Sequence, residues 1–309
     1  MKANVQKKKI TGNGFLLLIT IALFVVMYVA GMIVFADKGF AKPQMFLNLF
    51  VSNAGLLVIA CGLTIVMITG GIDISVGSVT ALVCMVLADL MENKGVNAYA
   101  AVLVALLIGV AFGIVQGFLV AYLDIQPFIV TLAGMFFGRG LTAIISTDMI
   151  SIKNKTFLAW ANYKIYLPIG SYSRRGKFIP AYIYPTVIIA ILIFIVVLDG
   201  LLAGCGGFLF CLNSCSGFVE QAKGLEMDAI SASVIGVTLL SGGVGTPFGT
   251  VFGVLIKGTI SSLITTQGTL SSWWVRIALS ALLCFFIVLR ALSCMTSVTC
   301  RCLFVFFLK

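Results

Sequence analysis

Long apolar runs recur along the whole sequence and set the first limit on its fold. A helix needs about 20 mostly apolar residues to cross a bilayer. Only 10% of the 309 residues are charged, whereas about 25% is usual in soluble proteins. The apolar runs cover residues 15–35, 46–69, 78–90, 98–123, 128–145, 182–198, 201–218, 229–240, 251–264 and 275–289. We predict an all-α polytopic membrane protein with about eight to ten transmembrane helices, some of them broken or re-entrant because several runs are short.

The charged residues lie mainly in tails and loops. Four lysines precede the first apolar run, which is typical of a cytoplasmic anchor; they are Lys2, Lys7, Lys8 and Lys9. We expect residues 1–14 to be a cytoplasmic basic tail, residues 15–292 to form the transmembrane domain, and residues 293–309 to be an atypical tail. The net charge of +10 therefore indicates membrane topology rather than binding to nucleic acid.

Residues 146–181 are too polar to span a membrane. They carry Trp160 and several tyrosines, side chains that suit the membrane interface. Counting the preceding spans from a cytoplasmic N-terminus places this loop outside, in the periplasm. Its positive net charge disagrees with the positive-inside rule, so the sequence leaves a helix count that is off by one as the alternative.

The sequence lacks the usual signatures of enzymes. It has no histidine, no Walker A loop, no Gly-x-Ser-x-Gly motif and no His-Glu-x-x-His motif. Its nine cysteines lie mostly in apolar runs, where cysteine behaves as a small hydrophobic residue. We therefore expect no catalytic residues, no metal site and no cofactor.

Two glycine-rich breaks share one spacing. Residues 69–79 and 241–251 both read small-Gly-Gly-x5-Gly-[Ser/Thr]-Val, and both interrupt apolar segments. Matching breaks in two halves are typical of transporters built from internal repeats, which place the translocation site there. Two unrelated glycine-rich turns are the alternative. The candidate residues for the path or its gating are Gly70, Gly71, Asp73, Ser75, Gly77, Ser78, Gly242, Gly243, Gly249 and Thr250.

Asp73 is the strongest single candidate for a functional residue, because a carboxylate at membrane depth needs a partner or a water-filled cavity. It would line the permeation path, or cap a helix that begins near Ser75 by accepting hydrogen bonds from free amides. Arg139 lies within another apolar run. It would either snorkel to the interface from a helix end or pair with an acid such as Asp73.

Several motifs resemble one known family. They are residues 63–78 (Leu-Thr-Ile-Val-Met-Ile-Thr-Gly-Gly-Ile-Asp-Ile-Ser-Val-Gly-Ser), residues 128–140 (Phe-Ile-Val-Thr-Leu-Ala-Gly-Met-Phe-Phe-Gly-Arg-Gly), residues 224–230 and residues 239–250. Together they resemble the permease subunits of bacterial sugar ABC importers of the ribose, galactose and xylose type. Residues 268–274 are most similar to galactofuranose-transporter permeases. The resemblance covers about residues 55–291.

The resemblance implies import of a monosaccharide across the bacterial cytoplasmic membrane. It implies a second permease subunit, identical or different, a separate ABC ATPase and a periplasmic sugar-binding protein, besides membrane lipid. ATP hydrolysis would lie on the ATPase, which agrees with the missing Walker A loop. An ion-coupled secondary transporter is a further alternative, against which the scarcity of acidic residues in the apolar runs weighs.

The chain departs from the family after Leu198. Family members carry a polar cytoplasmic loop that docks on the ATPase, whereas here Leu198 leads through Asp199 and Gly200 into the next apolar run. The alternative is thus a degenerate or truncated permease that lacks the docking loop and does not transport.

Overall fold

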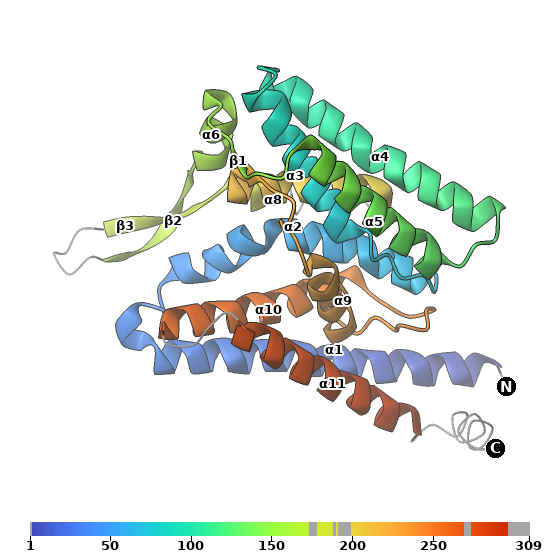
Figure 1. Cartoon of the computed structure of the whole chain (residues 1–309). Coiled ribbons are helices and arrows are strands. Elements are labelled where there is room, and N and C mark those ends of the chain that lie inside the picture. The colour runs from blue at the N-terminus through green and yellow to red at the C-terminus, as the bar shows by residue number, and fades with distance from the viewer. Residues whose placement is uncertain (1, 173–177, 188–189, 191–198, 269–272, 296–309) are drawn as a thin grey trace.

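Helices make up most of the structure, a computed structural model that describes residues 2–172, 178–187, 190, 199–268 and 273–295 (Figure 1). The helical, polytopic architecture predicted from the sequence is confirmed. The helices are α1 (Lys2–Val34), η1 (Ala36–Lys38), α2 (Pro43–Ile68), α3 (Val76–Glu92), α4 (Ala98–Tyr122), α5 (Pro127–Ile145), α6 (Lys155–Asn162), α8 (Asp199–Ser214), α9 (Leu225–Ile235), α10 (Pro247–Gln267) and α11 (Trp273–Met295). The strands are β1 (Ile150–Ser151), β2 (Ile165–Tyr172), β3 (Phe178–Ile183) and β4 (Ser216–Gly217).

Five segments of the described helices are long and apolar enough to cross a membrane. They are Gly14–Val34, Pro43–Ile68, Ala98–Tyr122, Pro127–Ile145 and Pro247–Gln267, and Trp273–Leu289 is a shorter apolar helix. Other predicted apolar runs form short helices, since α3 has 17 residues, α8 has 16 and α9 has 11. Most of the predicted run 182–198 lies outside the described residues.

Proline marks the starts of three long helices. Pro43, Pro127 and Pro247 lie at the first positions of α2, α5 and α10, where a missing N–H costs nothing. Pro127 therefore begins the helix that follows α4. At the N-terminus, α1 already begins at Lys2, so the predicted tail of residues 1–14 is continuous with the first helix.

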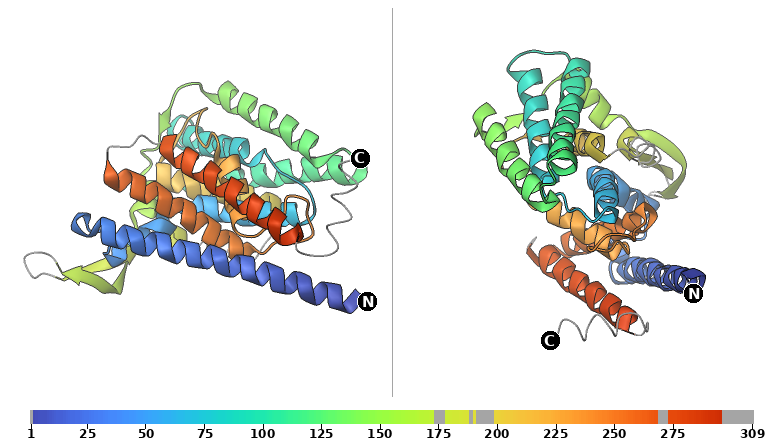
Figure 2. Two further views of the ribbon diagram at one scale, coloured as in Figure 1. Left: turned by 90° about the horizontal axis from the view of Figure 1, so that it is seen from below. Right: turned by 90° about the vertical axis from the view of Figure 1, so that its right-hand side faces the viewer.

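The short helix α8 lies at the centre of the bundle because three glycines let it approach three other helices. Gly204 faces the backbone of α4, Gly206 faces Ile59 and the backbone of α2, and Gly207 faces Val83 of α3. Small residues permit such close helix packing in membranes. Helices α3, α4 and α5 lie on one side of α2 and α8, and α1, α10 and α11 lie on the other (Figures 1 and 2).

The polar stretch of residues 146–181 contains strands, which the all-α prediction missed. Strands β2 and β3 form an antiparallel hairpin in which Tyr166 pairs with Tyr182. The ammonium of Lys164 lies 4.5 Å from the ring centroid of Tyr182. Alternating aromatic and β-branched residues favour strands, so the physical signal was present within a stretch that we interpreted only as a loop.

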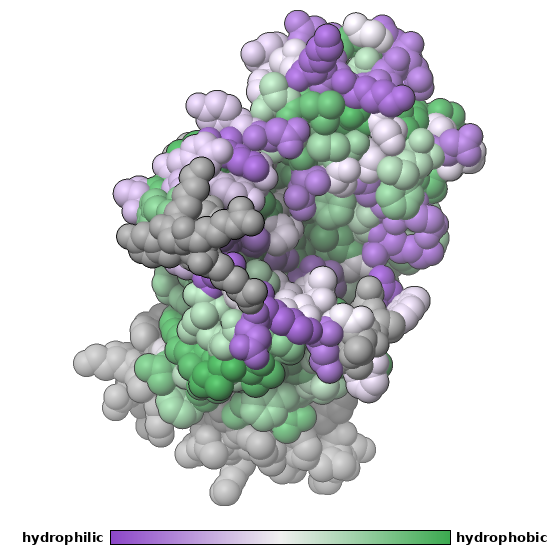
Figure 3. All heavy atoms as spheres, turned by 90° about the vertical axis from the view of Figure 1, so that its left-hand side faces the viewer, coloured by the Kyte–Doolittle hydropathy of each residue, from purple (hydrophilic) through white to green (hydrophobic). Residues whose placement is uncertain are grey.

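The hairpin and the N-terminus lie at opposite ends of the molecule (Figures 1 and 2). Hydrophilic residues are spread over much of the hairpin end (Figure 3). Strand β4, which follows α8, pairs with β1, which follows α5. The C-terminal ends of α5 and α8 therefore lie together at the hairpin end.

Candidate functional site at two glycine-rich breaks

The two glycine-rich breaks predicted from the sequence lie against each other. The first break separates α2 from α3, and the second separates α9 from α10. The amide of Gly243 donates to the carbonyl of Ile68 over 2.8 Å. A Cβ atom added to Gly242 would lie 2.8 Å from the Cα of Gly70. Gly70, Gly242 and Gly243 all have positive φ angles, between 79° and 89°, so these positions require glycine.

Asp73 is held by its own turn. Its Oδ1 atom accepts from the amide and from the hydroxyl of Ser75, each over 2.7 Å. Ser75 is the N-cap residue of α3 but makes no side-chain capping bond. Asp73 therefore accepts from a free amide at the start of α3, which is the contact that the capping interpretation predicted.

A residue that the sequence did not single out completes this polar group. Gln116 on α4 donates through Nε2 to the Ser75 hydroxyl over 3.0 Å. Gly134 on α5 leaves room for this amide, because a Cβ atom there would collide with Nε2 of Gln116. The group thus joins the first break to α4 beneath α5. Gln116 is 41 residues from Ser75, and no local pattern in the sequence relates the two.

The other candidates in the first break serve close packing. Gly71 lies against Val66 and Pro127. Gly77 faces Glu226, whose Oε2 atom occupies the space of a Cβ at Gly77. The hydroxyl of Ser78 donates to the carbonyl of Ser75 over 2.7 Å. These contacts place the start of α3 between α5, α9 and the first break.

The candidates in the second half join α10 to α9 and α2. Gly249 abuts the carbonyl of Gly236 so closely that any Cβ would collide with it. The hydroxyl of Thr250 lies 2.6 Å from that of Thr64, which lies 3.0 Å from that of Ser233. All three of these hydroxyl-bearing side chains are fully buried. They form a hydroxyl cluster (Thr64, Ser233, Thr250) beside the meeting breaks.

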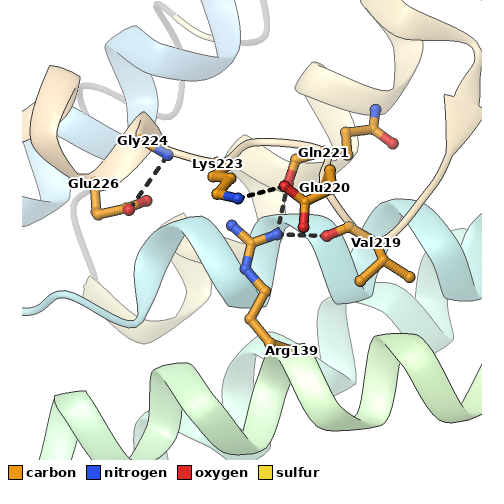
Figure 4. A network of polar contacts seen from close by, with 7 residues as sticks. All are labelled: Arg139, Val219, Glu220, Gln221, Lys223, Gly224 and Glu226. Carbon is orange, nitrogen blue, oxygen red and sulfur yellow. Dashed lines mark hydrogen bonds and ion pairs between the residues drawn. The ribbon is translucent and has the colours of Figure 1, made fainter.

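Arg139 does not pair with Asp73. Its Nη1 atom donates to the carbonyls of Val219 and Gln221 over 2.7 and 2.8 Å, which pins the segment before α9 to α5 (Figure 4). Among the described residues the ion pairs are Lys94–Asp89, Lys223–Glu220 and Lys257–Asp228. Asp73 has no cationic partner in that part of the chain.

Acidic residues lie in the first turn of α9. Glu226 and Asp228 occupy this turn, where a negative charge is favourable. Asp228 pairs with Lys257 of α10 over 3.2 Å. The Oε2 atom of Glu226 is buried without a hydrogen-bond partner within the described structure. The ion pair of Lys257 thus joins the two helices that flank the second break.

One strained residue in the second break carries no sequence signal. Val237 has a φ angle of 77°, a conformation that is a true outlier for a β-branched residue. It follows Gly236, the C-cap of α9. The next residue, Thr238, is buried and its hydroxyl has no partner among the described residues.

Comparison with known proteins identifies the family. The profile described as "Branched-chain amino acid transport system / permease component" matches residues 45–196. The inner membrane ABC transporter permease protein YjfF of Escherichia coli (strain K12) is 37% identical over 303 residues, covering 89% of this chain and 91% of YjfF. The family match includes the first break and Asp73.

Two further relatives are import permeases. The fructose import permease protein FruG of Bifidobacterium longum (strain NCC 2705) is 27% identical, covering 93% of this chain and 96% of FruG. The autoinducer 2 import system permease protein LsrC of Yersinia pestis (strain Pestoides F) is 29% identical, covering 82% of this chain and 79% of LsrC. No solved structure matches the chain.

The alignments also show that residues present in the relatives have no counterpart here. The alignment with FruG runs over 330 residues, which exceeds the 309 residues of the whole chain. The family match ends at residue 196. Members of this family are transport components rather than catalysts. The chain belongs to the family of ABC-transporter permease components and is a multi-pass protein of the cytoplasmic membrane.

Proposed function

We propose that this chain is the permease subunit of an ABC importer that carries a monosaccharide across the cytoplasmic membrane. Its partners would be a second permease subunit, an ABC ATPase that hydrolyses ATP, and a periplasmic sugar-binding protein. Two relatives support this assignment, because YjfF is an ABC transporter permease of the inner membrane and FruG is a fructose import permease. In this arrangement residues 1–14 face the cytoplasm and residues 146–181 face the periplasm, in keeping with their positions at opposite ends of the molecule (Figure 1).

The contact between the two breaks is the observation that carries the proposal. Transporters with internal repeats bind substrate where discontinuous helices of the two halves meet, because unwound backbone there faces a cavity instead of lipid. Here Gly243 bonds to Ile68 across the two breaks. The translocation path would pass this contact, with Asp73 holding the first break in shape.

Sugar uptake by an Asp73→Ala variant tests this placement. Asp73→Ala removes the acceptor of both Ser75 hydrogen bonds, and we expect uptake to fall by about tenfold. Asp89→Ala is the matched control, because Asp89 lies near the other end of α3 and pairs locally with Lys94. Uptake by Asp73→Ala equal to that of the parent, at matched membrane expression, would show the placement to be wrong.

The second candidate is a degenerate permease that inserts and binds partners without transporting. The FruG alignment, longer than this chain, favours it, because the residues absent here would include the segment that docks on the ATPase. Co-purification with the ATPase, followed by sugar-dependent ATP hydrolysis in liposomes, separates the two functions. Failure to recruit the ATPase would favour the degenerate permease, and uptake driven by an ion gradient without ATP would indicate a secondary transporter.

A further inference from the structure

We propose that Asp73, Ser75 and Gln116 form a binding site for two hydroxyl groups of a neutral sugar. This inference deepens the proposed function and rests on it. The site combines a carboxylate from the first break, a hydroxyl at the start of α3 and a carboxamide from α4. Carboxylates and carboxamides are suitable acceptors for sugar hydroxyls, because each offers oxygen lone pairs in a plane.

The Ser75 hydroxyl sets the orientation of the other two side chains. It has a single hydrogen, which it donates to Oδ1 of Asp73 over 2.7 Å. Its lone pair accepts from Nε2 of Gln116 over 3.0 Å. One hydroxyl therefore fixes both the carboxylate and the carboxamide, so the acceptors are positioned before a ligand arrives.

Two acceptor atoms remain after these bonds are made. Oε1 of Gln116 lies 3.3 Å from the Ser75 hydroxyl, whose only hydrogen already points to Asp73. Oδ2 of Asp73 has no hydrogen-bond partner among the described residues, and both side chains are partly exposed. Two such acceptors, both attached to side chains that contact Ser75, match a ligand that donates two hydrogen bonds.

The charges nearby favour a neutral donor. Asp73 has no ion pair among the described residues, and Arg139 is committed to the carbonyls of Val219 and Gln221. An anion would be repelled by the carboxylate. A partly buried carboxylate without a cation is stabilised by hydrogen bonds, and sugar hydroxyls supply them.

The position of the group agrees with such a role. Asp73 and Ser75 belong to the first break, whose Gly70 contacts the second break together with Ile68 at the end of α2. Thr131 on α5 holds the backbone of this break by donating to the carbonyl of Ile72 over 3.1 Å. A sugar crossing between the two halves would thus meet fixed acceptors on the first half.

Equilibrium binding to the full chain in lipid nanodiscs tests the site without requiring the ATPase. Saturation-transfer NMR would be recorded with D-fructose, D-ribose and D-galactose, and with the monodeoxy derivatives of the sugar that binds. A hydrogen bond to a charged acceptor is worth about tenfold or more in affinity. We expect removal of one particular hydroxyl to weaken binding to the parent chain by about that factor.

The variants Asp73→Asn and Gln116→Leu identify which side chain accepts a hydrogen bond from each sugar hydroxyl. In the variant that lacks the relevant acceptor, removal of the same hydroxyl should change affinity by less than about twofold. Asp89→Asn and Gln44→Leu are the controls, since Asp89 has local partners and Gln44 bonds to the backbone of Tyr182 far from the site. Both controls should keep the selectivity of the parent.

Three results would overturn the site. The first is an equal loss of affinity for every deoxy sugar in the parent and in both variants. The second is the absence of binding for all three sugars. The third is binding that depends on Na⁺ or K⁺, because this would assign the acceptors to a cation. ATP-dependent uptake by the parent together with the first result would leave the proposed function standing and reject only this site.

Discussion

The two breaks share a spacing but differ in chemistry. Gly245 stands where the first break has Asp73, and Pro247 stands where it has Ser75. Asp73 accepts two hydrogen bonds from Ser75, whereas Pro247 has no N–H to donate. The start of α10 is capped instead by Thr246, whose hydroxyl accepts from the amide of Gly249 over 3.2 Å.

The two breaks also differ in the contacts that hold them. The first break contains polar side chains and is held by α4 through Gln116. The second break is held by its backbone and by close glycine contacts, and a Cβ at Gly245 would lie 2.8 Å from Thr238 and 2.9 Å from Ile68. In the proposed site the first break would therefore bind the sugar, and the second break would pack against the first.

Gly249→Leu should have the largest effect, because it breaks the close contact of the second half. A side chain there collides with the carbonyl of Gly236, and overpacking of this severity costs about 3 kcal/mol. Unfolding in mixed SDS micelles measures the loss. Gly117→Leu on α4 is the control, since no atom lies within 4 Å of a Cβ there. Similar losses in the two variants would contradict the predicted contact.

Gly245→Asp introduces into the second break the carboxylate that the first break has at Asp73. We expect the free energy of unfolding to fall by about 2 kcal/mol. The new side chain meets Ile68 and Thr238, and Pro247 cannot donate to it. The same micelle titration would report the change. Gly243→Asp should lower the free energy of unfolding by less, although Gly243 has a positive φ angle, because a Cβ there meets no atom within 4 Å. The reverse order would show that side-chain space does not distinguish the two breaks.

Thr64→Val removes one hydroxyl from the hydroxyl cluster that joins the two halves. It should lower the free energy of unfolding by about 1 kcal/mol. Thr250→Val should cost a similar amount, because the two hydroxyls lie 2.6 Å apart. The double variant should lose less than the sum of the single losses. Fully additive losses in unfolding experiments would mean that the two hydroxyls do not stabilise each other.

Val237→Gly should have the smallest effect, because relief of strain offsets the loss of a buried side chain. Relief of the strained φ angle of 77° is worth about 1–3 kcal/mol, whereas loss of the buried valine side chain costs about 1.5–3 kcal/mol and glycine entropy about 0.5–1 kcal/mol. We expect the free energy of unfolding to fall by less than about 1 kcal/mol. Val234→Gly, within α9, should lose more stability, because Val234 is also buried and has no strained φ angle to relieve. Equal losses in the two variants would mean that the φ angle of Val237 stores no strain.

Helices and breaks were predictable because they follow from local properties of the chain. Apolar runs indicate spans, and a proline such as Pro127 between two apolar runs indicates the start of a helix. The matched glycines indicated that the two breaks correspond. Their contact through Gly243 and Ile68 is a tertiary feature that the repeat only suggested.

The unpredicted features depend on partners that have no sequence signature. Arg139 bonds to backbone carbonyls, and every residue has one, so the sequence offered only snorkelling or an acid such as Asp73 and did not indicate these partners. Gln116 lies in an apolar helix and joins Ser75 only because Gly134 opens the space. The strained Val237 has an ordinary strand-forming or helix-forming side chain.

The packing of α8 against three other helices makes its N-terminus a suitable position for an inserted segment. Its glycines touch α2, α3 and α4, while its first residue, Asp199, lies at the end away from β4 and the hairpin. Residues inserted before Asp199 would therefore leave these helix contacts intact. The N-terminus of α8 is thus a fixed attachment point, and a graft there of the corresponding segment of YjfF, with ATPase recruitment as the readout, would test the proposed degenerate permease directly.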